Sequence, residues 1–374
     1  MPRTRVMFVY WGRRGALSQF TLEVARAALK DEKLSTTISV SRQNELISSF
    51  EEFGPALLPI DTFSHGVSAV LQAWRIPRLR QKLYDRIRAD RIEAVIELIP
   101  HVWSFLLMPV VHKAGARYCT VIHDADAHPG DRSGLMKGLL DRVLPMADTV
   151  FTLSGAVAGR LEASGLAPVD KISILHHPDL TYSVRRPRPP RQPGDRVRLL
   201  FLGRIMAYKG LNLFIDTAER LRRDGVPVEI GVFGEGRLGQ SEARLQAMGA
   251  EIVNRWLTSE EIADALSRYD AVVLSHTEAS QSGVAATAFG AGVPVVATPV
   301  GGLIEQVVDG VTGVLAKRAD SDALADAVKL LFSEPGLYEN VCANLVRTSE
   351  DRSMAKFIED IVTHSVKPVI PTRV

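Results

Sequence analysis

The sequence predicts an α/β protein of two consecutive domains, each with a parallel sheet covered by helices on both faces. The chain has 374 residues, whereas a single hydrophobic core rarely grows beyond roughly 250–300 residues. Its opening segment has the pattern of strand, glycine loop and amphipathic helix with which α/β nucleotide-binding units begin. The same alternation of strand and helix restarts after a proline-rich stretch. We therefore expect two Rossmann-like domains.

The first domain is expected over residues 1–180. A strand at 5–10 leads into a loop with two glycines, Gly12 and Gly15, and the helix after this loop places its apolar residues on one face. The later apolar segments are separated by helical stretches, which favours a parallel sheet with both faces buried. These later strand candidates are 94–99, 118–122 and 149–153.

A linker is expected at 181–196, because prolines at the density found there cannot continue a helix or an inner strand. The second domain follows over 197–350. Its strand candidates are 197–202, 228–233, 271–275 and 294–297. Residues 351–374 are expected to form a C-terminal helix and a tail, and packing of that helix back on the first domain is one option.

Composition argues against several classes of protein. The 45 basic and 43 acidic residues leave a formal net charge of +2, so there is no global positive excess for nucleic-acid binding. Cys119 and Cys342 match no metal-ligand spacing and are typical of reduced thiols in the cytoplasm. The longest apolar run, 102–111, is well short of the ~20 residues that span a bilayer. We expect a cytoplasmic protein, with peripheral contact to the inner face of the cell membrane as an option.

A glycine turn with two cations follows the first strand of the second domain. Gly203, Arg204 and Lys209 lie between that strand and a helix, where ligands of open α/β sheets bind. Arginine can grip phosphate oxygens in a fork and lysine adds a point charge, so the segment suits a diphosphate. Two solvated surface cations beside a turn glycine are the alternative.

A second polar segment, 278–283, precedes a helix of small residues. Ser282 and Gly283 would let a ligand approach the helix start closely, where backbone N–H groups and the helix dipole bind phosphate. Glu278 and Gln281 stand beside this point in the sequence. A plain capped helix start is the alternative.

The order and spacing of these motifs resemble the retaining glycosyltransferases of family 4, also called group 1 glycosyltransferases, which have the GT-B fold. The resemblance is most specific from about 197 to 316 and weaker before the linker. It implies two Rossmann-like domains whose parallel sheets face one another across a cleft that holds the active site. The matching segments are Gly203–Gly210, Phe233–Gly236, Ser282–Thr298, Gly301–Glu305 and Asp309–Gly313.

The resemblance implies roles for individual residues of the second domain. Arg204 and Lys209 would hold the diphosphate of a nucleotide-sugar donor, and Asn254 lies where the family contacts the base. The implied donor-binding residues of this domain are Gly203, Arg204, Lys209, Asn254, Gln281, Ser282 and Gly283.

In the first domain, the resemblance implies that the loop with Gly12 and Gly15 closes over donor and acceptor. His123 matches a family histidine that reaches the transferred sugar. The implied catalytic residues are therefore His123, Arg204, Lys209 and Glu278.

One departure concerns the pair of glutamates, spaced E-x7-E, that most of the family carries. Their positions are occupied here by Ala279 and Thr287. Glu278 is one position from the first, and we interpret it as a replacement that contacts the sugar. The second glutamate, which binds the ribose in the family, has no counterpart at Thr287.

The segment 123–131 contains an Asp-x-Asp pattern that ends at Asp126, together with His123, His128 and Asp131. Oxygen and imidazole ligands at such spacing could hold a divalent metal. The resemblance implies the opposite, because arginine and lysine neutralise the leaving group, so we expect no metal and no cofactor. A structural loop and a loop that contacts sugar or acceptor remain the alternatives.

The segment 74–91 has seven basic and two acidic residues, a net charge of +5, with apolar residues at helical spacing. A solvated amphipathic helix is one interpretation. The other is contact with an anionic membrane through cations such as Arg78, Lys82 and Arg86, which would suit an acceptor on a lipid carrier.

The sequence therefore favours a retaining glycosyltransferase that uses a UDP- or GDP-sugar. The acceptor is expected to be a glycan or a lipid-linked glycan in exopolysaccharide or other surface-glycan assembly. A sugar-nucleotide epimerase of the same fold is one alternative. A non-catalytic nucleotide-sugar binding protein is another, because the second glutamate is missing.

Overall fold

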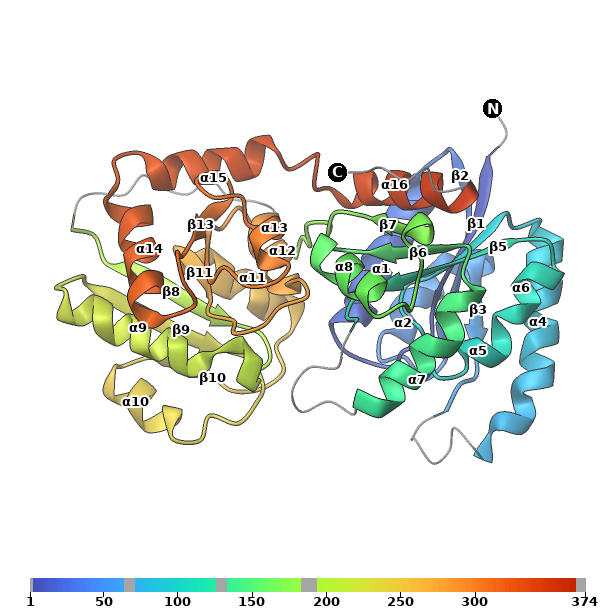
Figure 1. The fold of residues 1–374 in the computed structure, drawn as a ribbon, viewed down its shortest axis with the longest axis horizontal. Coiled ribbons are helices and arrows are strands. Elements are labelled where there is room, and N and C mark those ends of the chain that lie inside the picture. Colours follow the sequence, from blue (N-terminus) through green and yellow to red (C-terminus); the bar gives the residue numbers. More distant parts are fainter. Residues whose placement is uncertain (1–2, 64–70, 126–132, 183–193, 368–374) are drawn as a thin grey trace. The chain divides into compact units, whose positions relative to one another are not determined.

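The computed structural model describes residues 3–63, 71–125, 133–182 and 194–367 (Figure 1). The chain divides into two compact units. Unit 1 comprises Met1–His176 together with Met354–Val374, and unit 2 comprises His177–Ser353. Each unit contains one parallel sheet with helices on its faces, which confirms the expected α/β class with two Rossmann-like units.

Within the described residues, unit 1 has a seven-stranded parallel sheet in the order β3-β2-β1-β4-β5-β6-β7. Strand order reverses between β1 and β4, and ligands of such sheets bind at the carboxyl ends of the strands beside such a reversal. The strands are β1 (Thr4–Tyr10), β2 (Leu34–Ser41), β3 (Leu57–Ile60), β4 (Ala94–Glu97), β5 (Arg117–Ile122), β6 (Thr149–Thr152) and β7 (Ile172–Ile174).

The helices of unit 1 bury an apolar stripe against this sheet. In α1, for example, Phe20, Val24 and Ala28 are buried at the spacing of one helix face. The helices are α1 (Ala16–Lys30), α2 (Ile47–Phe50), α4 (Ile76–Asp90), α5 (Ser104–Leu107), α6 (Pro109–Lys113), α7 (Ser133–Val143), α8 (Gly155–Ala163) and α16 (Met354–Val366).

The C-terminal helix α16 belongs to unit 1. The Phe357 ring packs edge-on against Phe20 of α1 at a centroid distance of 5.8 Å. Arg117 of β5 donates a hydrogen bond from Nε to the backbone oxygen of Ser365 at 2.7 Å. The last helix therefore covers the sheet formed by the first part of the chain (Figure 1).

The boundary between the units lies at His177, four residues before the expected start of the linker at 181. Asp179 explains the difference, because its carboxylate pairs with Arg352 at 3.1 Å and its amide donates to the Arg352 oxygen. The Leu180 amide donates to the oxygen of Ala286 at 3.1 Å. Both residues are thus bonded to unit 2. Most of the expected linker, 183–193, lies outside the described residues.

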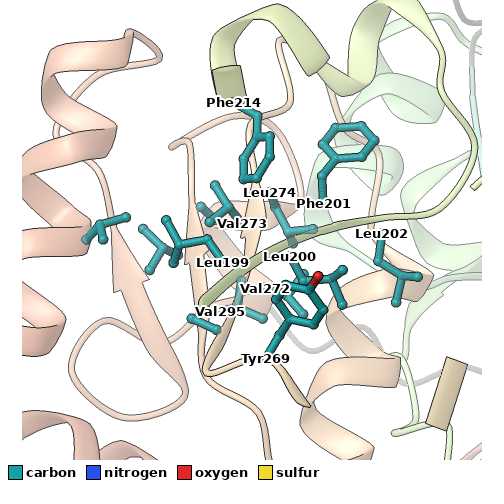
Figure 2. Close-up of a cluster of buried hydrophobic side chains, with 14 of the residues drawn as sticks. Leu199, Leu200, Phe201, Leu202, Phe214, Tyr269, Val272, Val273, Leu274 and Val295 are labelled. Carbon is teal, nitrogen blue, oxygen red and sulfur yellow. The ribbon is translucent and has the colours of Figure 1, made fainter. Parts of the chain in front are cut away.

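Unit 2 has a six-stranded parallel sheet within its described residues, in the order β10-β9-β8-β11-β12-β13. The core of unit 2 includes Leu199 and Phe201 of β8, Val272 of β11, and Phe214 of the helix that follows β8 (Figure 2). The strands are β8 (Val197–Leu202), β9 (Val228–Phe233), β10 (Glu251–Val253), β11 (Ala271–Leu274), β12 (Val295–Ala297) and β13 (Gly313–Leu315).

The helices of unit 2 follow the strands in alternation. Thr258 and Glu261 form the capping box expected from their spacing: the Thr258 hydroxyl accepts from the Glu261 amide, and the Glu261 carboxylate accepts from the Thr258 amide. The helices are α9 (Leu211–Arg223), α10 (Ser241–Ala247), α11 (Ser259–Arg268), α12 (Gly283–Gly290), α13 (Leu303–Gln306), α14 (Ser321–Ser333) and α15 (Leu337–Arg347). Among the described residues, no helix is long and apolar enough to cross a bilayer.

A buried carboxyl group stands at the end of β4 in unit 1. Glu97 is fully buried and accepts hydrogen bonds of 2.5 Å from Ser104 Oγ and from Tyr118 Oη. A weaker bond of 3.4 Å comes from the His101 amide. Burial raises the pKa of Glu97 to about 7, although these donors partly oppose the shift. The carboxyl group fastens the loop after β4 to the neighbouring strand β5.

We expect Glu97→Gln to remove a pH dependence of stability. The native state keeps the Glu97 proton up to a pKa of about 7, whereas the unfolded chain releases it near the ordinary value of 4.5. Between these pH values the native state binds more protons, so the free energy of unfolding falls as pH rises. Because each pKa unit corresponds to about 1.4 kcal/mol, the loss reaches up to about 3 kcal/mol in the wild type.

Urea unfolding across this pH range measures the effect, with the exposed Glu162→Gln as the control. The wild type should lose stability relative to Glu97→Gln, while the control tracks the wild type. A constant difference between wild type and Glu97→Gln would mean that Glu97 ionises at its ordinary pKa.

Candidate functional site

In unit 2 the carboxyl ends of β8 and β11 meet where strand order reverses. Gly203 follows β8 with φ +105°, and an added Cβ would lie 3.0 Å from Cγ2 of Val284 in the first turn of α12. This glycine therefore brings the end of β8 against the start of α12. Arg204 comes next, is exposed, and forms no ion pair with any residue in the described ranges.

Lys209 lies at the junction of the same two strand ends. It closes a 3₁₀ turn, Ala207–Lys209, and is partly buried. Its Nζ lies 2.9 Å from Nε2 of His276, which follows β11, and 5.5 Å from the centre of the Tyr208 ring. Because an ammonium group can only donate, protonated Lys209 donates to Nε2 of a neutral His276. His276, which the sequence did not single out, thus orients this cation.

The backbone after Lys209 is held against the end of β11. The Ser275 hydroxyl lies 3.1 Å from the oxygen of Lys209 and 2.9 Å from that of Gly210, to both of which it can donate. Gly210 has φ +68°, and an added Cβ would lie 1.8 Å from the Ser275 oxygen. Glycine is required at this position by both conformation and space.

A second tight contact joins the ends of β8 and β9. An added Cβ at Gly234 would lie 2.0 Å from the oxygen of Gly203. The Gly236 amide donates to Oδ1 of Asn254 at 3.1 Å. Asn254 is exposed at the end of β10, so the residue expected near the base also supports this glycine loop.

The start of α12 is fixed from two sides. The Ser282 hydroxyl accepts from the Ala285 amide at 3.3 Å and so caps the helix. The side chain of Gln306 in α13 bonds to both backbone groups of Ser282, accepting from its amide and donating to its oxygen, each at 2.9 Å. Sequence reasoning missed Gln306, which determines the backbone position of the expected phosphate site.

Glu278 and Gln281 lie on the loop between β11 and α12. Glu278 is exposed. Gln281 is partly buried, and its Oε1 accepts no hydrogen bond from a described residue. An added Cβ at Gly301 would lie 1.8 Å from the oxygen of Ala279, so this loop is packed closely against the turn before α13. Gln281 thus offers an unused acceptor beside the start of α12.

Thr287 stands where the family has its second glutamate. Its side chain is nearly buried, and its hydroxyl donates to the oxygen of Gly283 one turn earlier at 2.8 Å. The hydroxyl is therefore engaged within α12, and Thr287 does not replace the missing carboxylate.

In unit 1 the loop after β1 is bound to residues that follow β2. The amide of Gly15 donates to Oε1 of Glu45 at 2.8 Å, and Asn44 Nδ2 donates to the oxygen of Gly12 at 2.9 Å. An added Cβ at Gly12 would lie 2.4 Å from the Tyr10 ring. Gly15 has φ +104° and precedes α1. The positive φ favours glycine at position 15, and a side chain at position 12 would displace the Tyr10 ring.

His123 lies at the end of β5 and is almost fully buried. Its Nε2 is 2.9 Å from the oxygen of Leu98, and its ring meets Phe20 edge-on at 6.1 Å. A carbonyl can only accept, so Nε2 carries the proton and Nδ1 is the acceptor of the neutral ring. Burial lowers the pKa of His123, although Asp124 opposes this. The neutral ring therefore presents Nδ1 as an acceptor.

An aromatic cluster that sequence reasoning missed stands near the ends of β1, β3 and β4. The His101 ring packs against Trp11, Phe63 and Trp103 at centroid distances of 6.0, 5.2 and 5.9 Å. Its Nδ1 accepts from the Trp103 amide at 3.2 Å. Burial lowers the pKa of His101 to about 4, so the ring is neutral near pH 7. The signal in the sequence was an aromatic residue shortly after each of three strands: Trp11 directly after β1, Phe63 three residues after β3 and Trp103 six residues after β4.

The structure thus places Gly12, Gly15 and His123 in unit 1 and the other expected site residues in unit 2. Of the segment 123–131, for which a metal site was an alternative, Asp126, His128 and Asp131 lie outside the described residues. Within the described residues, no three His, Cys, Asp or Glu side chains are grouped as metal ligands would be. The metal hypothesis therefore stays untested.

Comparison with known proteins relates the chain to glycosyltransferases. Residues 196–334 match the family model for group 1 glycosyl transferases. The chain is 29% identical over 281 residues to a glycogen synthase of Mycobacterium tuberculosis, covering 69% of this chain and 64% of the relative. It is 33% identical over 197 residues to a D-inositol 3-phosphate glycosyltransferase of Paenarthrobacter aurescens, covering 50% and 47%. It therefore spans less than two thirds of the length of either relative.

A solved structure of Anabaena HepE with UDP and glucose has a similar fold. The TM-score is 0.72 at 13% sequence identity, and the match covers 96% of this chain and 99% of HepE. At this identity the similarity concerns the fold alone.

We expect Gly210→Ala to destabilise unit 2 far more than Gly292→Ala. Both glycines have nearly the same left-handed conformation, with φ +68° and +70°. Left-handed backbone costs a residue with a Cβ about 1–2 kcal/mol. Only Gly210 adds a clash, because its Cβ would meet the Ser275 oxygen, whereas nothing lies within 4 Å at Gly292.

Urea unfolding of the two variants isolates the clash, because the conformational strain is common to both. The Gly210 variant should lose additional stability of a few kcal/mol, on the scale of overpacked cores. Equal losses would show that the contact between Gly210 and the end of β11 relaxes without cost.

Proposed function

We propose that the protein is a retaining glycosyltransferase that moves a sugar from a nucleoside-diphosphate sugar to a glycan or lipid-linked acceptor. The observation that carries the proposal is the junction of β8, β11 and α12: Gly203, which precedes Arg204, lies against Val284 at the start of α12, and Lys209 lies against His276 after β11. This junction lies within the segment that matches group 1 glycosyl transferases.

The chemistry of such a transfer suits these groups. The bond between the anomeric carbon and the diphosphate breaks, and negative charge grows on the departing phosphate oxygen. Arg204 and Lys209 stabilise that charge, and the amides at the start of α12 add donors to the same diphosphate. His276 keeps Lys209 in place before the donor arrives, so little reorganisation is needed.

Other residues are proposed to bind the rest of the donor. Glu278 and Gln281 are assigned to the sugar, because one is an exposed carboxylate and the other has an unused acceptor. Asn254 is assigned to the base of UDP or GDP. In unit 1, His123 accepts from a hydroxyl of the transferred sugar through Nδ1. The proposed use of UDP is consistent with HepE, which was solved with UDP and glucose.

Two cations at the leaving group also support a reaction that needs no metal and no cofactor. We further propose a cytoplasmic role in exopolysaccharide or other surface-glycan assembly. The basic segment 74–91 supports peripheral contact with the membrane that would present a lipid-linked acceptor.

The proposed function is tested by incubating the full chain with a panel of UDP- and GDP-sugars and candidate acceptors, with and without EDTA. Transfer with retained anomeric configuration, unchanged by EDTA, is the expected result. Isomerised sugar without acceptor would identify an epimerase, and bound but unchanged donor a binding protein. Loss of transfer in EDTA, restored by Mn²⁺ or Mg²⁺, would assign the segment 123–131 to a metal.

We expect Arg204→Ala and Lys209→Ala each to reduce turnover at saturating donor by about 10²–10³-fold, as for loss of one preorganised electrostatic donor. The double variant should lose less than the product of the two effects, because both cations grip one diphosphate. The melting temperature should change little for Arg204→Ala, since an exposed cation contributes little to stability, and somewhat more for Lys209→Ala, which also loses the bond to His276.

Arg223→Ala is the matched control, since Arg223 is an exposed cation at the opposite end of α9 from Gly210. It should retain wild-type turnover. Near wild-type turnover in either site variant would mean that the diphosphate binds elsewhere.

A further inference from the structure

A groove lies between α4 and α6 of unit 1, away from the residues assigned to the donor. Its volume is about 380 Å³. Ile76 and Val110 contribute apolar walls, Tyr84 a phenol, and Arg80 and Lys113 two cations. The two helices pack side by side, so both cations border the same space (Figure 1).

The side chains of the two groove cations are not bonded to other described residues of unit 1. Across the described residues, neither Arg80 nor Lys113 makes an ion pair or a hydrogen bond through its side chain. Other cations of α4 are engaged: Lys82 donates to the oxygen of Pro59 at 2.8 Å, and Arg86 bonds to Asp90 at 2.5 Å and to the oxygen of Pro55 at 2.6 Å. Some cations of α4 thus bond to other parts of unit 1, whereas Arg80 borders the groove.

This division changes the set of cations that could contact a membrane. Arg78, Lys82 and Arg86 were expected from the sequence, but Lys82 bonds to the backbone of β3 and Arg86 to the backbone just before it. Of the other cations, Arg78, Arg88, Arg91 and Lys113 are exposed and Arg80 is partly exposed.

Two large apolar side chains are exposed just before α4. Leu71 is 70% exposed and Trp74 is 63% exposed. The guanidinium groups of Arg75 and Arg78 lie over the Trp74 ring at 5.5 and 5.6 Å. Tryptophan flanked by cations is typical of the interface between lipid headgroups and acyl chains.

We propose that the groove between α4 and α6 binds the phosphate headgroup of an anionic phospholipid. Arg80 and Lys113 contact the phosphate, while Leu71 and Trp74 enter the interface beside it. Charge complementarity favours this occupant, because two uncommitted cations and an exposed aromatic anchor meet at one end of α4. The inference rests on the proposed peripheral location but not on glycosyl transfer.

Vesicle sedimentation with the full chain tests the proposal. Wild-type protein should bind phosphatidylcholine vesicles that contain phosphatidylglycerol, bind pure phosphatidylcholine weakly, and release at high salt. Arg80→Gln with Lys113→Gln should weaken binding roughly thirty-fold, from about 1 kcal/mol per cation. The matched control is Lys30→Gln with Lys33→Gln, which removes the same charge from exposed positions at the end of α1 and after it, and should change binding little.

A second variant tests the apolar anchor without changing charge. Trp74→Ser should weaken binding to anionic vesicles while leaving the melting temperature unchanged, because its ring is largely exposed.

Equal losses in the groove variant and the lysine control would overturn the proposal in favour of diffuse attraction. Displacement from vesicles by inorganic phosphate at constant ionic strength would overturn it in favour of a soluble anion. If the wild type does not bind anionic vesicles, the proposal is wrong and the surface is assigned to a protein partner. Transfer activity measured in solution would still support the proposed function.

Discussion

The close approach of the backbone at Gly210 to the end of β11 is the constraint on which the candidate site depends. The Ser275 hydroxyl holds the carbonyls of Lys209 and Gly210, and no side chain larger than hydrogen fits between them. This contact brings Lys209 to His276, which follows Ser275 on the neighbouring strand end. The cation is therefore positioned by main-chain packing within the sheet rather than by a flexible loop.

The strands were predictable where helices cover both of their faces. β8 and β9 begin and end as expected, because an inner parallel strand reads as a continuous apolar run. The three-residue strands β7, β10 and β13 escaped detection, because so short a strand shows no period, whereas the equally short β12 was expected at 294–297 from its apolar residues. β2 was missed because its buried residues include Thr37, Ser39 and Ser41, which look polar in sequence but find partners in the fold.

The cations of the site were predictable because they belong to a motif with fixed spacing, whereas the residues that position them were not. His276 acts through one hydrogen bond and Gln306 through two, each to a group distant in sequence, and such bonds leave no periodic trace. Glu97 did leave a trace, since one carboxylate interrupts the apolar run 94–99, whose first four residues form β4. The cations of α4 were read as one surface, but only the structure could separate those tied to Pro55 and Pro59 from those along the groove.

The placement of α16 has a consequence for how the protein is made. Phe357, Ile358 and Ile361 are almost completely buried, so the first unit completes its core with residues from the far end of the chain. Unit 2 is contiguous, from His177 to Ser353, and contains all of its own sheet. During synthesis on the ribosome, all residues of the second unit therefore emerge before the first unit is complete. The segment that emerges first must wait, with part of its apolar surface uncovered, until translation reaches the last helix.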